Sequence, residues 1–76
     1  MNKKRRALLN SAVGLLGNAS NIIEGVIDDE QDSYDNMPEN LQESENCHKM
    51  EDAIDGLQDA VDYIENAIDR IRESSG

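Results

Sequence analysis

The chain has 76 residues, 37% of them hydrophobic, and its only aromatic residues are Tyr34 and Tyr63. A chain of this size gains ample stability from one core only when a disulfide, a metal or self-association supports it. One cysteine excludes an intrachain disulfide, and no cluster of metal-ligand residues stands out in the sequence. Composition therefore favours long helices that associate with a second copy, and it predicts no cofactor.

Charge is distributed unevenly along the sequence, which carries seven bases, seventeen acids and a net charge of −10. Four bases lie together as Lys3, Lys4, Arg5 and Arg6, so the balance from Ala7 onward is 3 − 17 = −14. Such a body repels nucleic acid and suits a basic partner surface, although acidity also serves solubility alone. The basic cluster would contact a phosphate backbone or an anionic membrane, or be neutralised beside the end of the last helix near Glu73.

The amino end resembles a signal peptide, because four bases precede an apolar run. Asn10 and Ser11 interrupt that run, and the helical pattern continues to Ile27. Asn10, Asn18 and Asn21 would be costly inside a bilayer. We therefore expect a cytoplasmic protein without a membrane span, and a free cysteine fits that compartment.

The first helix is predicted over about residues 2–32. Its apolar residues cover about half of the circumference, more than one antiparallel neighbour buries. Gly14, Gly17 and Gly25 each cost roughly 1 kcal/mol of helix propensity, and close approach of another helix is the usual compensation. A kink near residues 14–17 is the alternative. Acids crowd the carboxyl end of this helix, where they oppose the helix dipole and predict fraying.

The connection is predicted over about residues 33–44. Pro38 disfavours helical geometry at Met37, and Asn36 with Glu39 resembles a capping box. We expect a short helical turn over residues 38–42 and a kink or break at Glu43 and Ser44. Ser44 followed by Glu45 is a start signal for the second helix.

The second helix is predicted over about residues 45–73, with fraying beyond it. Three heptads, AIDGLQD, AVDYIEN and AIDRIRE, run from residue 53 to residue 73. Spacings of four and three alternate through a seam, as in a helix that keeps one stripe against a partner. The seam comprises Met50, Ile54, Leu57, Val61, Ile64, Ile68 and Ile71. Ala53, Ala60 and Ala67 form a column of small residues beside it.

The fold class predicted from these elements is all-α, an antiparallel helical hairpin forming one domain. The excess apolar arc of each hairpin predicts an antiparallel, two-fold dimer with a four-helix bundle. Its expected oligomerisation core is Leu9, Val13, Leu16, Ile23, Ile27, Ile54, Leu57, Val61, Ile64, Ile68 and Ile71.

Catalytic chemistry finds little support in the sequence. Cys47 and His48 are adjacent, so on a helix they point about 100° apart and do not form a nucleophile–base pair readily. The heptad register buries Cys47 and exposes His48. No phosphate-binding loop or metal set is present, and we predict that the protein is not an enzyme.

A stripe of acids opposite the seam is the candidate interaction face, and it comprises Asp52, Asp55, Asp59, Asp62, Asp69 and Glu73. These acids recur roughly every 5 Å along the helix, compared with about 3.4 Å per phosphate along a DNA strand. A second acidic zone spans residues 24–48. Together they would imitate a nucleic-acid backbone, whereas a solvated helix face is the structural alternative.

The middle of the chain carries a resemblance over about residues 27–73. The residues that carry it are Asp29-Glu30-Gln31, Tyr34-Asp35-Asn36-Met37-Pro38-Glu39-Asn40-Leu41-Gln42, Ser44, Met50-Glu51-Asp52-Ala53-Ile54-Asp55 and Leu57. This pattern resembles small acidic proteins encoded by phages and prophages of Gram-positive bacteria. The group has no established activity, so the resemblance implies a phage setting in a bacterial cytoplasm and assigns no functional residue.

Two functional hypotheses follow from the sequence. The first is a non-enzymatic phage or prophage protein that binds a host macromolecule, as an inhibitor or nucleic-acid mimic directed at a basic protein surface. The second is a structural or assembly module that joins copies of a phage component through its helical bundle. Direct nucleic-acid binding is not expected, and membrane association through the first helix is a weaker third hypothesis.

Overall fold

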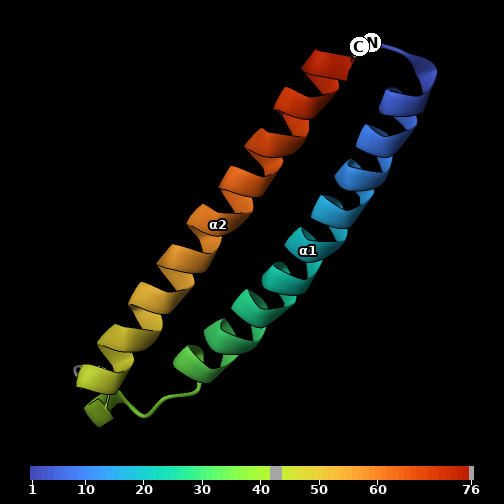
Figure 1. Ribbon diagram of the computed structural model, residues 1–76. Coiled ribbons are helices and arrows are strands. Elements are labelled where there is room, and N and C mark those ends of the chain that lie inside the picture. The colour runs from blue at the N-terminus through green and yellow to red at the C-terminus, as the bar shows by residue number, and fades with distance from the viewer. Residues whose placement is uncertain (42–43, 76) are drawn as a thin grey trace.

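Two long helices dominate the computed structural model, which describes residues 1–41 and 44–75. Helix α1 runs over Lys3–Asp35 and helix α2 over Glu45–Ser75, with a short 3-10 helix, η1, at Glu39–Leu41 between them. The long helices lie side by side and antiparallel, so that the two chain ends meet at one tip (Figure 1). The predicted all-α hairpin is confirmed.

Local hydrogen bonds fix where α1 begins and ends. The Asn2 side-chain oxygen accepts a bond from the Arg5 backbone N–H at 2.9 Å, which satisfies a free donor of the first turn. The helix continues to Asp35, three residues beyond the predicted end, and Asn36 caps it by donating to the Asp32 carbonyl. The predicted fraying of this acidic end is absent, because packing of Tyr34 against α2 holds the last turn in place.

The connection follows the turn signals of the sequence. The Leu41 N–H donates to the Pro38 carbonyl at 2.8 Å, which closes η1 immediately after the proline. Ser44 then caps the start of α2, since its hydroxyl accepts a bond from the Cys47 N–H at 3.2 Å. A break was expected at Glu43 and Ser44, and Glu43 lies outside the described residues. At its other end α2 extends through Ser74 and Ser75, which were expected to fray.

The two helices meet along a seam in which both contribute residues at alternating spacings of four and three. On α2 this seam buries Cys47, Ile54 and Val61, of which Cys47 has no exposed surface, and on α1 it buries Ser20. The residues expected to form the oligomerisation core all lie in this seam within a single chain, and those not buried are half-buried. Within one chain these residues therefore hold the two helices of the hairpin together.

The glycines of both helices do not mediate close helix approach within the hairpin. A side-chain carbon added at Gly14, Gly17, Gly25 or Gly56 would meet nothing within 4 Å. The expectation of a tight crossing there is wrong for the single chain. The expected kink is also absent, because α1 continues as a helix past residues 14–17.

Candidate functional site

Two long faces flank the seam on opposite sides of the hairpin. Residues that follow a seam residue by one position lie on one flank, and residues that precede a seam residue by one position lie on the other. Because the helices are antiparallel, the residues that directly follow seam residues in α1 lie on the same side of the molecule as those that directly follow seam residues in α2. The hairpin therefore presents two different faces, each built from α1 and α2 together.

The acidic stripe predicted on α2 lies on the surface along the length of the helix. All six of its residues, Asp52, Asp55, Asp59, Asp62, Asp69 and Glu73, are exposed. In the described part of the chain Lys49 pairs with Glu45 and the His48 ring contacts the Glu51 carboxylate, both at 3.7 Å. Neither contact involves the stripe, so its carboxylates face solvent and form no ion pair among the described residues.

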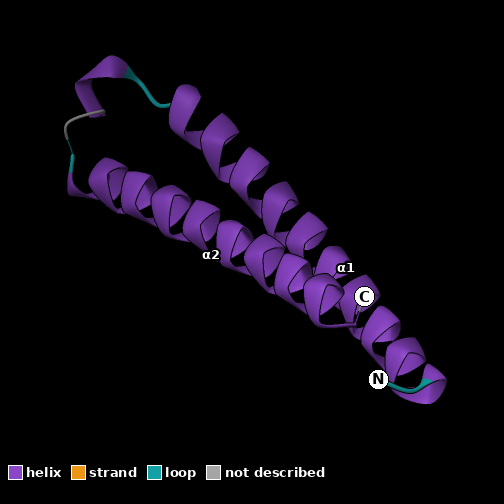
Figure 2. Ribbon diagram, turned by 90° about the horizontal axis from the view of Figure 1, so that it is seen from above, coloured by secondary structure: helices purple, strands orange, loops and turns teal. Residues whose placement is uncertain are grey.

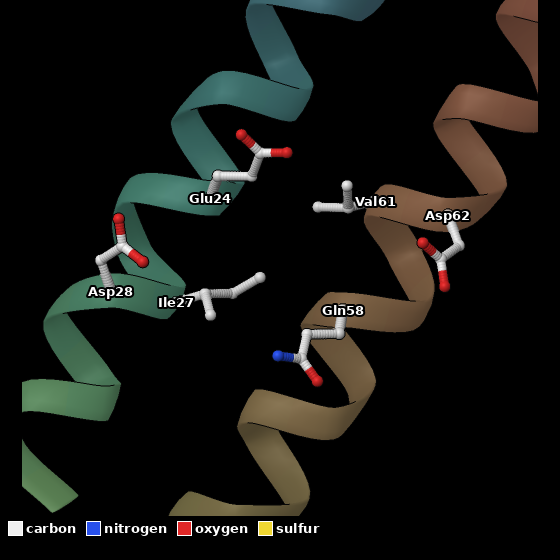
Figure 3. Close-up of a pocket in the computed structure, with 6 residues that line it drawn as sticks. All are labelled: Glu24, Ile27, Asp28, Gln58, Val61 and Asp62. Carbon is white, nitrogen blue, oxygen red and sulfur yellow. The ribbon is translucent and has the colours of Figure 1, made fainter. Parts of the chain in front are cut away.

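An open groove of about 480 Å³ brings acids of α1 next to this stripe. Figure 3 shows Ile27 and Val61 pointing toward one another between the helices, with Glu24 and Gln58 reaching in from either side. Asp28 and Asp62 complete the lining, so the six residues include three carboxylates and no base. We call these six residues the acidic groove.

Sequence reasoning placed Asp62 in the stripe and Glu24 and Asp28 in the second acidic zone, but it did not place these three acids side by side and it missed Gln58. A signal for them exists, because each follows a seam residue by one position. It becomes useful only once the antiparallel pairing is known. A smaller groove, which includes Asp55 and Glu51, continues the same flank toward the connection.

One hydrogen bond across the helices anchors this flank near the connection. The Tyr34 hydroxyl donates to the Glu51 carboxylate at 2.5 Å. That bond, together with desolvation and the nearby negative charge, raises the pKa of Tyr34 to about 12. The phenol therefore stays protonated and fixes the end of α1 against the first turns of α2.

The opposite flank carries a face without acids along most of its length. The apolar face consists of Leu8, Ala12, Leu15, Ala19, Ile22 and Val26 on α1 and Ala53, Gly56, Ala60, Tyr63 and Ala67 on α2. Leu15 is 71% exposed, Ile22 69% and Tyr63 73%. Isolated exposed apolar residues are ordinary, but a continuous strip of them marks an interaction surface.

Basic residues gather at the tip where the chain ends meet. Six of the seven bases are there, namely Lys3, Lys4, Arg5 and Arg6 on α1 and Arg70 and Arg72 on α2. Figure 2 shows the first turns of α1 and the last turns of α2 at the same end of the hairpin, as in Figure 1. Among the described residues no ion pair joins this cluster to Glu73, the neighbour expected to neutralise it.

The residues with catalytic potential are kept apart. Cys47 is a free thiol with no exposed surface, inside the seam, whereas His48 is exposed on the next position of the helix. No group of three or more possible metal ligands occurs among residues 1–41 and 44–75. Within the same residues no helix is long and apolar enough to cross a bilayer.

No protein-family model matches the sequence, and neither a curated protein nor a solved structure shows significant similarity to it. The function must therefore be argued from the two faces of the hairpin.

Proposed function

We propose that this chain is a non-enzymatic acidic protein, of phage or prophage origin, that binds a basic surface on a host macromolecule in the bacterial cytoplasm. The observation that carries the proposal is the acidic stripe, which is exposed along α2 and forms no ion pair among the described residues. A rigid row of carboxylates attracts a cationic groove and repels nucleic acid.

The form of the stripe favours mimicry of a nucleic-acid backbone. From Asp52 to Glu73 it extends over about 30 Å at a rise of about 1.5 Å per residue. Glu24 and Asp28 of the acidic groove widen the charged surface beside Asp62, so the partner meets carboxylates from both helices. A protein that binds DNA or RNA offers the matching cationic groove, and occupation of that groove would inhibit it.

Capture from a lysate of a Gram-positive host tests this proposal. The wild-type hairpin is compared with a variant carrying Asp52→Asn, Asp55→Asn, Asp59→Asn and Asp62→Asn, which removes four charges with little change of side-chain volume. We expect the wild type to enrich basic proteins that double-stranded DNA displaces. The variant should lose at least about 90% of that signal, since several charge contacts disappear together.

A matched control removes the same charge elsewhere. Asp32→Asn, Asp35→Asn, Glu39→Gln and Glu45→Gln take four charges from the part of the second acidic zone nearest the connection, which the proposal places outside the contact, and leave the stripe and the acidic groove intact. This control should retain the partners. Equal loss in both variants would show that net charge alone is responsible, and retention by both would contradict acidic mimicry.

The second candidate function is an assembly module that joins copies of a larger component. The continuous exposure of the apolar face favours this role, because an open strip of this kind is buried readily by another helical surface. A homodimer with a four-helix bundle is the smallest assembly that would cover it. Light scattering separates the two roles: a large, concentration-dependent assembly supports the module, and a discrete dimer supports the binding protein.

A further inference from the structure

The apolar face of α1 is a second seam, separate from the one that holds the hairpin together. Its residues, Leu8, Ala12, Leu15, Ala19, Ile22 and Val26, repeat the alternating spacing of four and three. Leu8 remains 62% exposed and Val26 46% exposed, so α2 leaves this seam largely open. A helix with two such seams is suited to two neighbours.

We propose that a second copy of this chain docks on the apolar face, antiparallel and about a two-fold axis that passes α1 near residue 17. In an antiparallel two-fold contact, a residue that lies a given number of positions before the axis in one copy faces the residue that lies the same number of positions after it in the other copy. Across the axis Leu15 would then face Ala19, and Ile22 would face Ala12. Leu8 would face Val26. Each larger side chain meets a smaller one, which is the self-complementary packing that a two-fold interface requires.

Charge selects the same orientation. Arg5 continues the second seam beyond Leu8, and Asp29 continues it beyond Val26 at the other end. About the proposed axis Arg5 of one copy meets Asp29 of its partner, and the pairing occurs twice. A parallel dimer would instead bring together the six bases of each tip, twelve in all, and separate them from the acids near the connection, which is unfavourable.

The apolar face is long enough for extended helix pairing. Its α1 part runs about 27 Å from Leu8 to Val26 at a rise of about 1.5 Å per residue, and the small residues and Tyr63 of α2 widen it. The acidic groove lies on the opposite flank and stays accessible in this arrangement. The inference is therefore independent of the acidic function, and either can fail without the other.

Sedimentation equilibrium of the intact chain tests the proposal. The wild type should form a discrete dimer, and Leu15→Glu with Ile22→Glu should raise the dimer dissociation constant at least about 100-fold. Asn10→Glu with Gln31→Glu adds the same charge to exposed positions on the opposite flank of α1 and should leave the dissociation constant within about threefold. A monomeric wild type, an unaffected Leu15→Glu/Ile22→Glu variant, or equal effects of both pairs would overturn the proposal.

A charge exchange tests the orientation without placing charge in the apolar face. Arg5→Asp alone should weaken the dimer about tenfold, because two attractive contacts become repulsive. Adding Asp29→Arg in the same chain should restore wild-type affinity, since the pair is re-formed with reversed sign. Far-UV circular dichroism confirms the helix content of each variant. A folded Arg5→Asp/Asp29→Arg variant that stays weak would overturn the antiparallel register.

Discussion

Tyr34 and Glu51 are seventeen positions apart in sequence, yet they form the hydrogen bond that locks the last turn of α1 to α2. The end of α1 otherwise has two disadvantages, because acids oppose its dipole and no base lies in the last turn. A neutral phenol that donates to a carboxylate offsets both by holding the turn against its neighbour. This contact explains why the helix reaches Asp35.

The ionisation of Tyr34 gives a direct prediction. In a Tyr63→Phe background, the absorbance of the phenolate should report a pKa of about 12 for Tyr34. Adding Glu51→Gln should return it toward the ordinary value near 10, because the charged acceptor is gone. An unchanged titration in the Glu51→Gln variant would contradict the assigned cause.

The same pKa determines how stability depends on pH. The folded-state pKa is raised above that of the unfolded chain, so this contribution is fully present below about pH 10 and is lost as the pH rises toward 12. Urea unfolding should therefore show a steeper loss of stability over that interval than in a Tyr34→Phe control. Parallel curves for the two proteins would contradict the linkage.

At the scale of the helices, the interior glycines of α1 weaken it without serving the hairpin. Gly14→Ala should raise the free energy of unfolding by about 1 kcal/mol, because alanine has the better helix propensity and open space surrounds the added carbon. Gly25→Ala is a second position with the same expectation. Urea unfolding followed at 222 nm measures the change. A folded but destabilised Gly14→Ala variant would show that this position packs against another chain.

Much of each helix follows from local sequence. The alternating spacing predicts the seam of α2, and the register places Cys47 inside and His48 outside, where the structure has them. Ser44 predicts the start of α2 because its hydroxyl supplies a missing acceptor. The end of α1 could not be predicted in this way, since it depends on the long-range contact between Tyr34 and Glu51.

The candidate site was only partly predictable for the same reason. The acids of α2 share one outward column, which the heptads reveal without knowledge of a neighbour. Glu24 and Asp28 join them only because antiparallel pairing brings the following residues of both helices to one side. The apolar face was visible in sequence as an excess arc on α1. Its separation from the hairpin seam required knowing which apolar residues α2 leaves exposed.

At the scale of the whole molecule, the hairpin separates two kinds of surface. One flank is acidic and carries the groove at Glu24, Asp28 and Asp62, whereas the other is apolar and carries Leu15 and Ile22. The bases cluster at one tip and most acids lie elsewhere. This arrangement lets one flank meet a cationic partner while the other meets a second copy.

Partner capture by variants of the two faces, quantified side by side, tests this central claim most directly. The Leu15→Glu/Ile22→Glu variant should still enrich the basic proteins that the wild type binds, because its acidic stripe is intact. The variant with asparagine in place of Asp52, Asp55, Asp59 and Asp62 should lose them while it remains dimeric. The opposite result, with capture lost through the apolar face and retained without the acids, would contradict the account.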